Sequence, residues 1–161
     1  LGREIFQMTS SPRRRRITQI GTVTGVVDGS VIIIRENTGR FQEIRLLGVT
    51  TPEIIRPGVD CYGEEARDAL RAEILGTQVS IEREGSYQRD SYRRLVRYVR
   101  LGSQDVNAWL IWNGYAQADA NHDHERLNEY QSLEKQAQEA KRGLWSTKCE
   151  YNDQLEEVEV L

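Results

Sequence analysis

The first third of the sequence constrains the fold most, because it contains three stretches of strand-like composition. Stretches 17–27, 31–35 and 40–49 are rich in Val, Ile and Thr, and they are separated by Asp28-Gly29 and by Asn37-Thr38-Gly39. β-branched residues favour extended strands, and short Asp-Gly or Asn-containing turns join such strands into hairpins. The sequence therefore predicts three consecutive strands joined by tight turns.

A helix and two further strands are predicted after this part of the chain. Residues 64–75 carry apolar side chains at four-residue steps, and Gly76 follows them. This spacing and the glycine stop are typical of an amphipathic helix. Residues 77–83 and 94–101 are predicted to form strands from their content of apolar and β-branched residues.

Two more helices are predicted in the last third of the chain. Asp105 suits the N-cap of a helix that ends at Asn113-Gly114, and a longer helix runs from His124 to Leu144. The tryptophans at helical spacing are expected to pack in the core: Trp109, Trp112 and Trp145. The order of elements predicts an α+β domain, a five-stranded OB-fold Greek-key barrel with three helices.

Composition predicts one domain without a membrane span. The chain has 161 residues, of which 38% are hydrophobic and 29% charged, and no apolar run approaches the roughly 20 residues that a spanning helix needs. The sequence begins with Leu1 and shows no secretory signal pattern, so we expect a fragment or processed product of a longer chain.

Segments of opposite charge flank the predicted domain. Residues 12–16 are one proline and four arginines, whereas residues 150–161 contain five acidic side chains and no basic one. We therefore expect a basic N-terminal arm at residues 1–16, the barrel domain at 17–146 and an acidic tail at 147–161. The arm either contacts phosphates or is a solvated terminus.

The two cysteines leave two alternatives open. Cys61 and Cys149 are too few for a disulfide framework, and they lack the spacing of a zinc site. They can pair if the fold brings them together, or they can be two unrelated free thiols.

Several short motifs, in the same order, resemble the staphylococcal nuclease family. In the most informative one, residues 44–53, a strand carries Arg45 and the following turn carries Thr51 and Glu53. The other matching motifs are Val27-Asp28-Gly29-Ser30-Val31, Tyr62-Gly63-Glu64-Glu65-Ala66, Asp90-Ser91-Tyr92-Arg93-Arg94, Val106-Asn107-Ala108, Asn113-Gly114-Tyr115-Ala116 and Gly143-Leu144-Trp145-Ser146. The resemblance implies an OB-fold barrel and calcium-dependent cleavage of DNA and RNA by in-line attack of water on a phosphodiester.

The resemblance also implies roles for individual residues. Glu53 matches the glutamate that orients or deprotonates the attacking water, and Arg45 and Arg94 match the two arginines that clamp the phosphate. Planar guanidinium groups suit the charge that phosphoryl oxygens gain toward the transition state. Without a catalytic role, Arg45 would pair with an acid of a neighbouring strand, Glu53 would cap a turn, and Arg94 would be one of many arginines in an arginine-rich segment. Tyr92 is expected to contact substrate or to pack on the barrel rim.

The metal ligands depart from the family pattern. The family binds calcium through two aspartates, whose positions are Ser30 and Thr50 here. Calcium takes roughly 6 to 8 oxygen ligands and its affinity depends on their charge, so we expect it to bind weakly or not at all. Asp28 and Thr51, with Glu53 and a substrate phosphate, are the residues expected to form a degraded metal site.

Two other departures concern the substrate and the histidines. The tyrosine-bearing loop of the family reads Asp119-Ala120-Asn121-His122 here, and Ser91 replaces the basic residue before Tyr92. Base stacking in this loop is therefore expected to be weaker. His122 and His124 are expected to be solvated residues at a helix terminus rather than metal ligands.

Three functions remain open from the sequence. The favoured one is a nuclease with a weakened or remodelled calcium site, since Arg45, Glu53 and Arg94 are retained together. The second is a non-catalytic OB-fold module that binds nucleic acid or protein. The third is a scaffold within a longer chain that has no affinity for nucleic acid. DNA or RNA is the expected partner.

Overall fold

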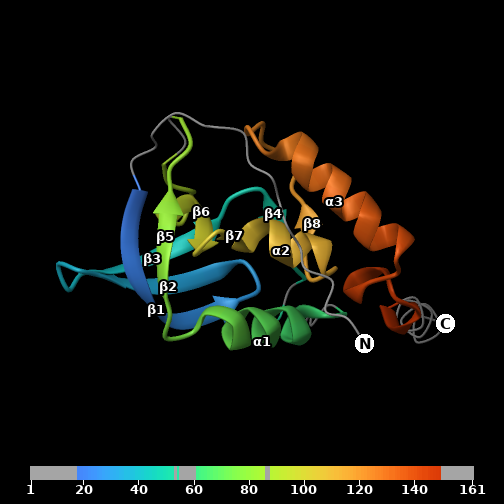
Figure 1. The fold of residues 1–161 in the computed structure, drawn as a ribbon, viewed down its shortest axis with the longest axis horizontal. Coiled ribbons are helices and arrows are strands. Elements are labelled where there is room, and N and C mark those ends of the chain that lie inside the picture. The colour runs from blue at the N-terminus through green and yellow to red at the C-terminus, as the bar shows by residue number, and fades with distance from the viewer. Residues whose placement is uncertain (1–17, 53, 55–60, 86–87, 150–161) are drawn as a thin grey trace.

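The computed structural model describes residues 18–52, 54, 61–85 and 88–149, in which five strands close into a barrel (Figure 1). The strands are β1 (Thr18–Asp28), β2 (Val31–Glu36), β3 (Phe41–Leu46), β5 (Gln78–Glu82) and β6 (Leu95–Leu101). They follow the order β3-β2-β1-β5-β6, and a parallel pairing between β3 and β6 closes the sheet. The predicted five-stranded barrel is confirmed.

Shorter strands and the helices surround this barrel. The short strands are β7 (Gln104–Asp105), which pairs with β6, and β4 (Val49–Thr50), which pairs with β8 (Gln117–Ala118). The helices are α1 (Gly63–Ile74), α2 (Val106–Trp112), α3 (Leu127–Glu139) and the 3-10 helix η1 (Gly143–Trp145). Helix α1 packs against β1, while α2 packs against β6 and against α3 (Figure 1).

Alternate strand residues fill the barrel interior. Ile32 and Ile34 of β2 are fully buried, as is Ile44 of β3, whereas Ile33 and Arg45 remain partly exposed. Successive side chains of a strand point to opposite faces, so one face of each strand closes the core. Each fully buried aliphatic side chain stabilises the fold by about 1.5 to 3 kcal/mol.

A turn at Gly48 interrupts the strand predicted at residues 40–49. Gly48 has a φ of 77°, and a Cβ atom there would lie 2.5 Å from the ring of His124. The left-handed backbone and the close approach both require glycine at this position. The chain therefore leaves β3 after Leu46, and β4 pairs with β8.

The last helix is shorter than the sequence predicts. It begins at Leu127 instead of His124, and Lys141, with a φ of 52°, separates it from η1. Side-chain contacts hold the residues before it, since His124 and Arg126 are only 6% and 2% exposed. The prediction that His124 is a solvated helix terminus is therefore wrong.

Buried ionic contacts hold the start of α3 on the barrel. Arg126 donates from Nη1 to Oδ2 of Asp105 at 2.8 Å and from Nη2 to Oε2 of Glu82 at 2.5 Å. The hydroxyl of Tyr130 donates to the same Asp105 carboxylate. Burial alone would lower the pKa of Arg126, but Asp105, Tyr130 and Glu82 raise it overall. The charged guanidinium is therefore paired with two carboxylates, which offset the cost of burying its charge.

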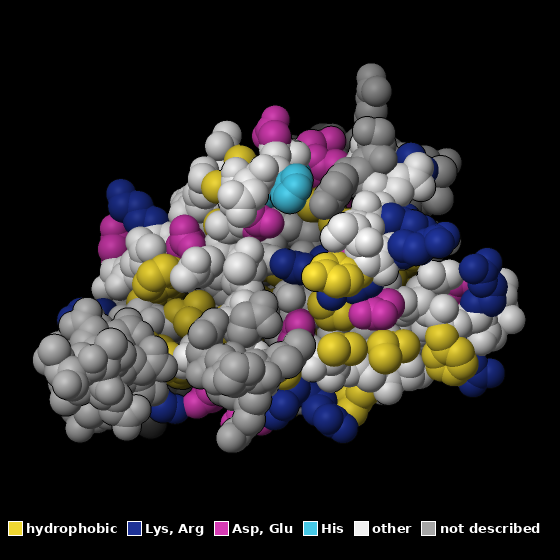
Figure 2. All heavy atoms as spheres, turned by 180° about the vertical axis from the view of Figure 1, so that it is seen from behind, with side chains coloured by type: hydrophobic (Ala, Val, Ile, Leu, Met, Phe, Trp, Pro, Cys, Tyr) yellow, Lys and Arg dark blue, Asp and Glu magenta, His cyan; other side chains and the backbone are white. Residues whose placement is uncertain are grey.

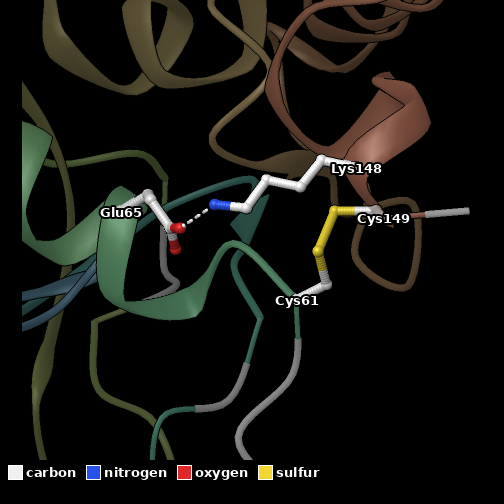
Figure 3. The surroundings of a disulfide bond; sticks show 4 residues. All are labelled: Cys61, Glu65, Lys148 and Cys149. Carbon is white, nitrogen blue, oxygen red and sulfur yellow. Dashed lines mark hydrogen bonds and ion pairs between the residues drawn. A yellow bond between two sulfur atoms is a disulfide. The ribbon is translucent and has the colours of Figure 1, made fainter. Parts of the chain in front are cut away.

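A disulfide bond joins Cys61 to Cys149 (Figure 3). Their Cα atoms are 5.6 Å apart, and beside the bond Lys148 donates to Glu65 of α1 at 2.5 Å. Of the two alternatives that the sequence left open, the cysteines therefore form a pair and are not two free thiols. It also attaches residues 148 and 149, at the start of the predicted acidic tail, to the beginning of α1.

The remaining parts of the predicted tail and arm lie outside the described residues. These are residues 150–161 and the basic arm at 1–16. Among the helices that the structure describes, none is both long and apolar enough to cross a membrane. Trp109 and Trp112 pack against the core, as predicted, whereas Trp145 in η1 is partly buried and is not part of the core cluster.

Candidate active site

The two predicted phosphate-binding arginines, Arg45 and Arg94, line one cavity. Its volume is about 340 Å³, and it lies beside the turn that follows β3. The parallel pairing of β3 with β6 brings the arginines together, because Arg45 stands opposite Val96, two residues after Arg94. The other polar residues that line the cavity are Asp90, Ser91, Tyr92, Asp119 and His122.

Arg45 is fixed by two backbone carbonyls, one at the end of its own strand and one in β4. Its Nη1 donates to the carbonyl of Leu46 at 3.0 Å, and its Nη2 donates to the carbonyl of Val49 at 2.8 Å. Burial lowers the pKa of Arg45, and the nearby Asp28 carboxylate opposes that effect. Since guanidinium groups stay protonated in proteins, Arg45 is a fixed positive charge, and these two contacts use two of its five N–H donors.

Arg94 is oriented by Asp90 in the preceding loop. Its Nε donates to Oδ2 of Asp90 at 2.7 Å, while Oδ1 of Asp90 accepts the backbone N–H groups of Arg94 and Tyr92 at 2.9 and 3.0 Å. Burial would raise the pKa of Asp90, but the hydrogen bonds from Arg94 outweigh it and lower the pKa. The ionised carboxylate therefore positions the guanidinium. Sequence reasoning did not single out Asp90, although it stands in the same motif as Arg94.

Contacts from α2 and β8 hold the turn that borders the cavity. The buried Asn107 donates from Nδ2 to the carbonyl of Leu47 at 2.8 Å, and its Oδ1 accepts the N–H of Val99 at 3.1 Å. The N–H of Asp119 donates to the carbonyl of Gly48 at 2.9 Å. The turn is thus tied to both elements. The Asp119 carboxylate, in the loop that the family resemblance places near the substrate, adds a negative charge to the cavity wall.

The described oxygen donors do not fit a calcium ion. Oδ1 of Asp28 accepts the backbone N–H and the hydroxyl of Ser30 at 2.7 and 3.0 Å. Thr51 packs against Gly29, where a Cβ atom would meet its Cγ2 at 2.9 Å. Within the described ranges, no group of three His, Cys, Asp or Glu side chains is placed to hold a metal. One carboxylate with neutral hydroxyls falls well short of the ligand charge that calcium requires.

Of the remaining predicted site residues, one lies outside the described residues and three are exposed. Glu53, the predicted base, lies outside the described residues, and Thr50 is exposed at the end of β4. Tyr92 is 79% exposed, with the Cζ atom of Arg94 4.9 Å from its ring centroid. This exposure argues against packing on the barrel rim, and contact with a substrate stays a prediction. His122 is exposed, as predicted, with its Nδ1 3.8 Å from Oδ2 of Asp119.

Comparison with known protein families assigns this barrel to one of them. The model of the family described as staphylococcal nuclease homologue matches residues 43–147. The chain belongs to this family. The matched range includes Arg45, Arg94 and the turn at Gly48, so the residues given above as lining the cavity all lie within it.

Named relatives agree with this assignment. The thermonuclease of Staphylococcus hyicus is 34% identical over 127 residues, which are 77% of this chain and 74% of the relative. The thermonuclease of Staphylococcus intermedius is 35% identical over 98 residues, 60% of this chain. A probable staphylococcal-like nuclease of Oryza sativa subsp. japonica is 33% identical over 112 residues, 70% of this chain. The chain spans 57% and 21% of the lengths of these last two relatives.

Proposed function

We propose that this staphylococcal nuclease homologue hydrolyses the phosphodiester bonds of DNA or RNA. The observation that carries the proposal is that Arg45 and Arg94, from separate parts of the chain, line the same cavity. Two fixed guanidinium groups in a partly enclosed site suit a phosphodiester, whose oxygens accept paired hydrogen bonds. The thermonucleases among its relatives support the same class of reaction.

In the proposed reaction, water attacks phosphorus in line with the leaving oxygen. Arg45 and Arg94 stabilise the negative charge that the phosphoryl oxygens gain as the bond to the leaving oxygen breaks. Asp90 acts by keeping Arg94 in position. Glu53 is proposed to accept a proton from the attacking water.

Calcium is expected to bind this chain weakly or not at all, because the Asp28 carboxylate already accepts two hydrogen bonds from Ser30. We predict that calorimetric titration of the protein with calcium alone gives no heat, or a Kd on the order of 10⁻³ M. Thymidine 3′,5′-bisphosphate is expected to strengthen calcium binding, because its phosphates add oxygen ligands. A micromolar Kd for calcium alone would contradict this prediction.

A cleavage assay tests the proposed reaction directly. Wild-type protein is expected to cleave single-stranded DNA or RNA with calcium, magnesium or manganese, and Glu53→Gln is expected to abolish the activity because an amide cannot accept the proton. The pairing of Asp28 with Ser30 favours one alternative, a non-catalytic module. That alternative predicts salt-dependent binding with no turnover by wild-type protein under any of these ions.

A further inference from the structure

The outer face of the β2–β3 hairpin shares Arg45 with the cavity. Ile44 and Leu46 point into the barrel, so Phe41, Glu43 and Arg45 share the outer face of β3. Arg45 lines the cavity, and Phe41 lies four residues from it, about 13 Å along the strand. A ligand that occupies the cavity can therefore extend along β3 to Phe41.

This face carries an exposed aromatic ring and a partly exposed isoleucine. Phe41 is 64% exposed, and its partner across the ladder is the exposed Arg35. One step closer to the cavity, the partly exposed Ile33 stands opposite Glu43. Ile33 also lies over Gly25 of β1, where a Cβ atom would be 3.4 Å from its Cδ1. Because Gly25 has no side chain, the Ile33 side chain lies directly over the backbone of β1.

Figure 2 looks at the molecule from behind, so the hairpin seen at the left of Figure 1 lies at the right. A row of hydrophobic side chains runs along the lower right of this view, with Lys and Arg side chains around it. Exposed apolar patches rimmed by polar groups are typical of binding surfaces. An aromatic ring with neighbouring guanidinium groups is the combination on which single-stranded nucleic acid stacks.

We infer that the outer face of the β2–β3 hairpin binds the unpaired bases of a single-stranded nucleic acid whose phosphate occupies the Arg45–Arg94 cavity. This inference rests on the proposed function. Phe41 stacks on a base, and Arg35 and Arg40, next to it, contact the base face or the backbone. The same strands of other OB-folds bind oligonucleotides.

The charges on the face indicate how the strand lies on it. Glu43 stands between Phe41 and Arg45 on the outer face of β3. Its carboxylate repels phosphates but accepts hydrogen bonds from base edges, so bases face the sheet at this point. In a duplex the bases are already stacked and paired, and they cannot lie on Phe41. The face therefore selects single strands.

The test compares a probe that fills only the cavity with one that also reaches the hairpin. The probes are thymidine 3′,5′-bisphosphate, measured by calorimetry, and a dye-labelled phosphorothioate oligothymidylate of twelve residues, measured by fluorescence anisotropy in calcium. Phe41→Ala is expected to raise the Kd for the oligonucleotide roughly 5- to 100-fold while leaving the Kd for the bisphosphate unchanged. Phe41→Trp is expected to retain the oligonucleotide affinity. Leu75→Ala, which removes another exposed apolar side chain just after α1, is the matched control.

The outcomes separate this inference from the proposed function. If wild-type protein binds neither probe, the proposed function fails and the hairpin inference falls with it. If wild-type protein binds both probes but Phe41→Ala binds the oligonucleotide as tightly as Leu75→Ala does, only the hairpin inference is overturned. It is also overturned if duplex DNA binds as tightly as the single strand. A wild-type dimer that Phe41→Ala converts to a monomer in sedimentation would assign the face to a second copy instead.

Discussion

Replacing Arg94 by alanine is expected to lower kcat/KM for single-stranded DNA by about 10²- to 10³-fold, the loss typical of removing one preorganised donor to a developing negative charge. The guanidinium lines the cavity and is held by Asp90 at 2.7 Å, so it is in position before substrate arrives. Most of the effect should fall on kcat, because the charge on the phosphoryl oxygens grows toward the transition state. Steady-state kinetics at several substrate concentrations measure the two constants separately.

A second variant at this position shows whether charge or geometry matters, and a variant on α1 is the control. Arg94→Lys retains the positive charge but loses the planar pair of donors, so its activity should lie between those of wild type and Arg94→Ala. Arg71→Ala removes the same charge from the exposed side of α1 and should leave kcat/KM unchanged. Equal activities of Arg94→Ala and Arg71→Ala, with wild-type thermal melting of both, would contradict a role for Arg94 in the reaction. If wild type shows no turnover, the affinity for thymidine 3′,5′-bisphosphate is compared in the same variants.

The strands of the barrel could be predicted from local sequence, whereas its closure could not. Alternating apolar residues and turn dipeptides mark β1, β2 and β3 without any knowledge of their partners. The parallel pairing that sets Ile44 opposite Leu95 joins residues about fifty positions apart, and no local pattern encodes it. The position of Arg45 beside Arg94 depends on that pairing. It was therefore accessible from sequence only through the family resemblance.

The burial of His124 could not be predicted from the sequence, because the residues that bury it are distant along the chain. His124 stands between the acidic residues Asp123 and Glu125, which is a typical setting for a solvated residue. In the structure its ring fits against Gly48, and its Nδ1 lies 2.9 Å from the hydroxyl of Tyr98. Burial lowers the pKa of His124 and favours the neutral ring. Only the tertiary contacts reveal this environment.

Removing the disulfide is expected to lower the free energy of unfolding by about 4 kcal/mol, because the bond closes a loop with a separation of 88 residues in the unfolded chain. For a chain of this length, that loss corresponds to a fall in Tm of roughly 10 °C. Guanidinium denaturation of wild type and of the double variant Cys61→Ser, Cys149→Ser measures the difference. Wild-type protein treated with a reducing agent should match the double variant.

The ion pair beside the disulfide provides the control for this measurement. Lys148 and Glu65 are well exposed, so Lys148→Ala should leave the denaturation midpoint close to that of wild type. An Ellman titration of unfolded, unreduced protein should find no free thiol, since both cysteines are paired. Equal unfolding free energies for oxidised and reduced wild type would contradict a stabilising role. Because cytosolic reductants cleave most disulfides, the predicted stabilisation applies only where the bond is kept oxidised.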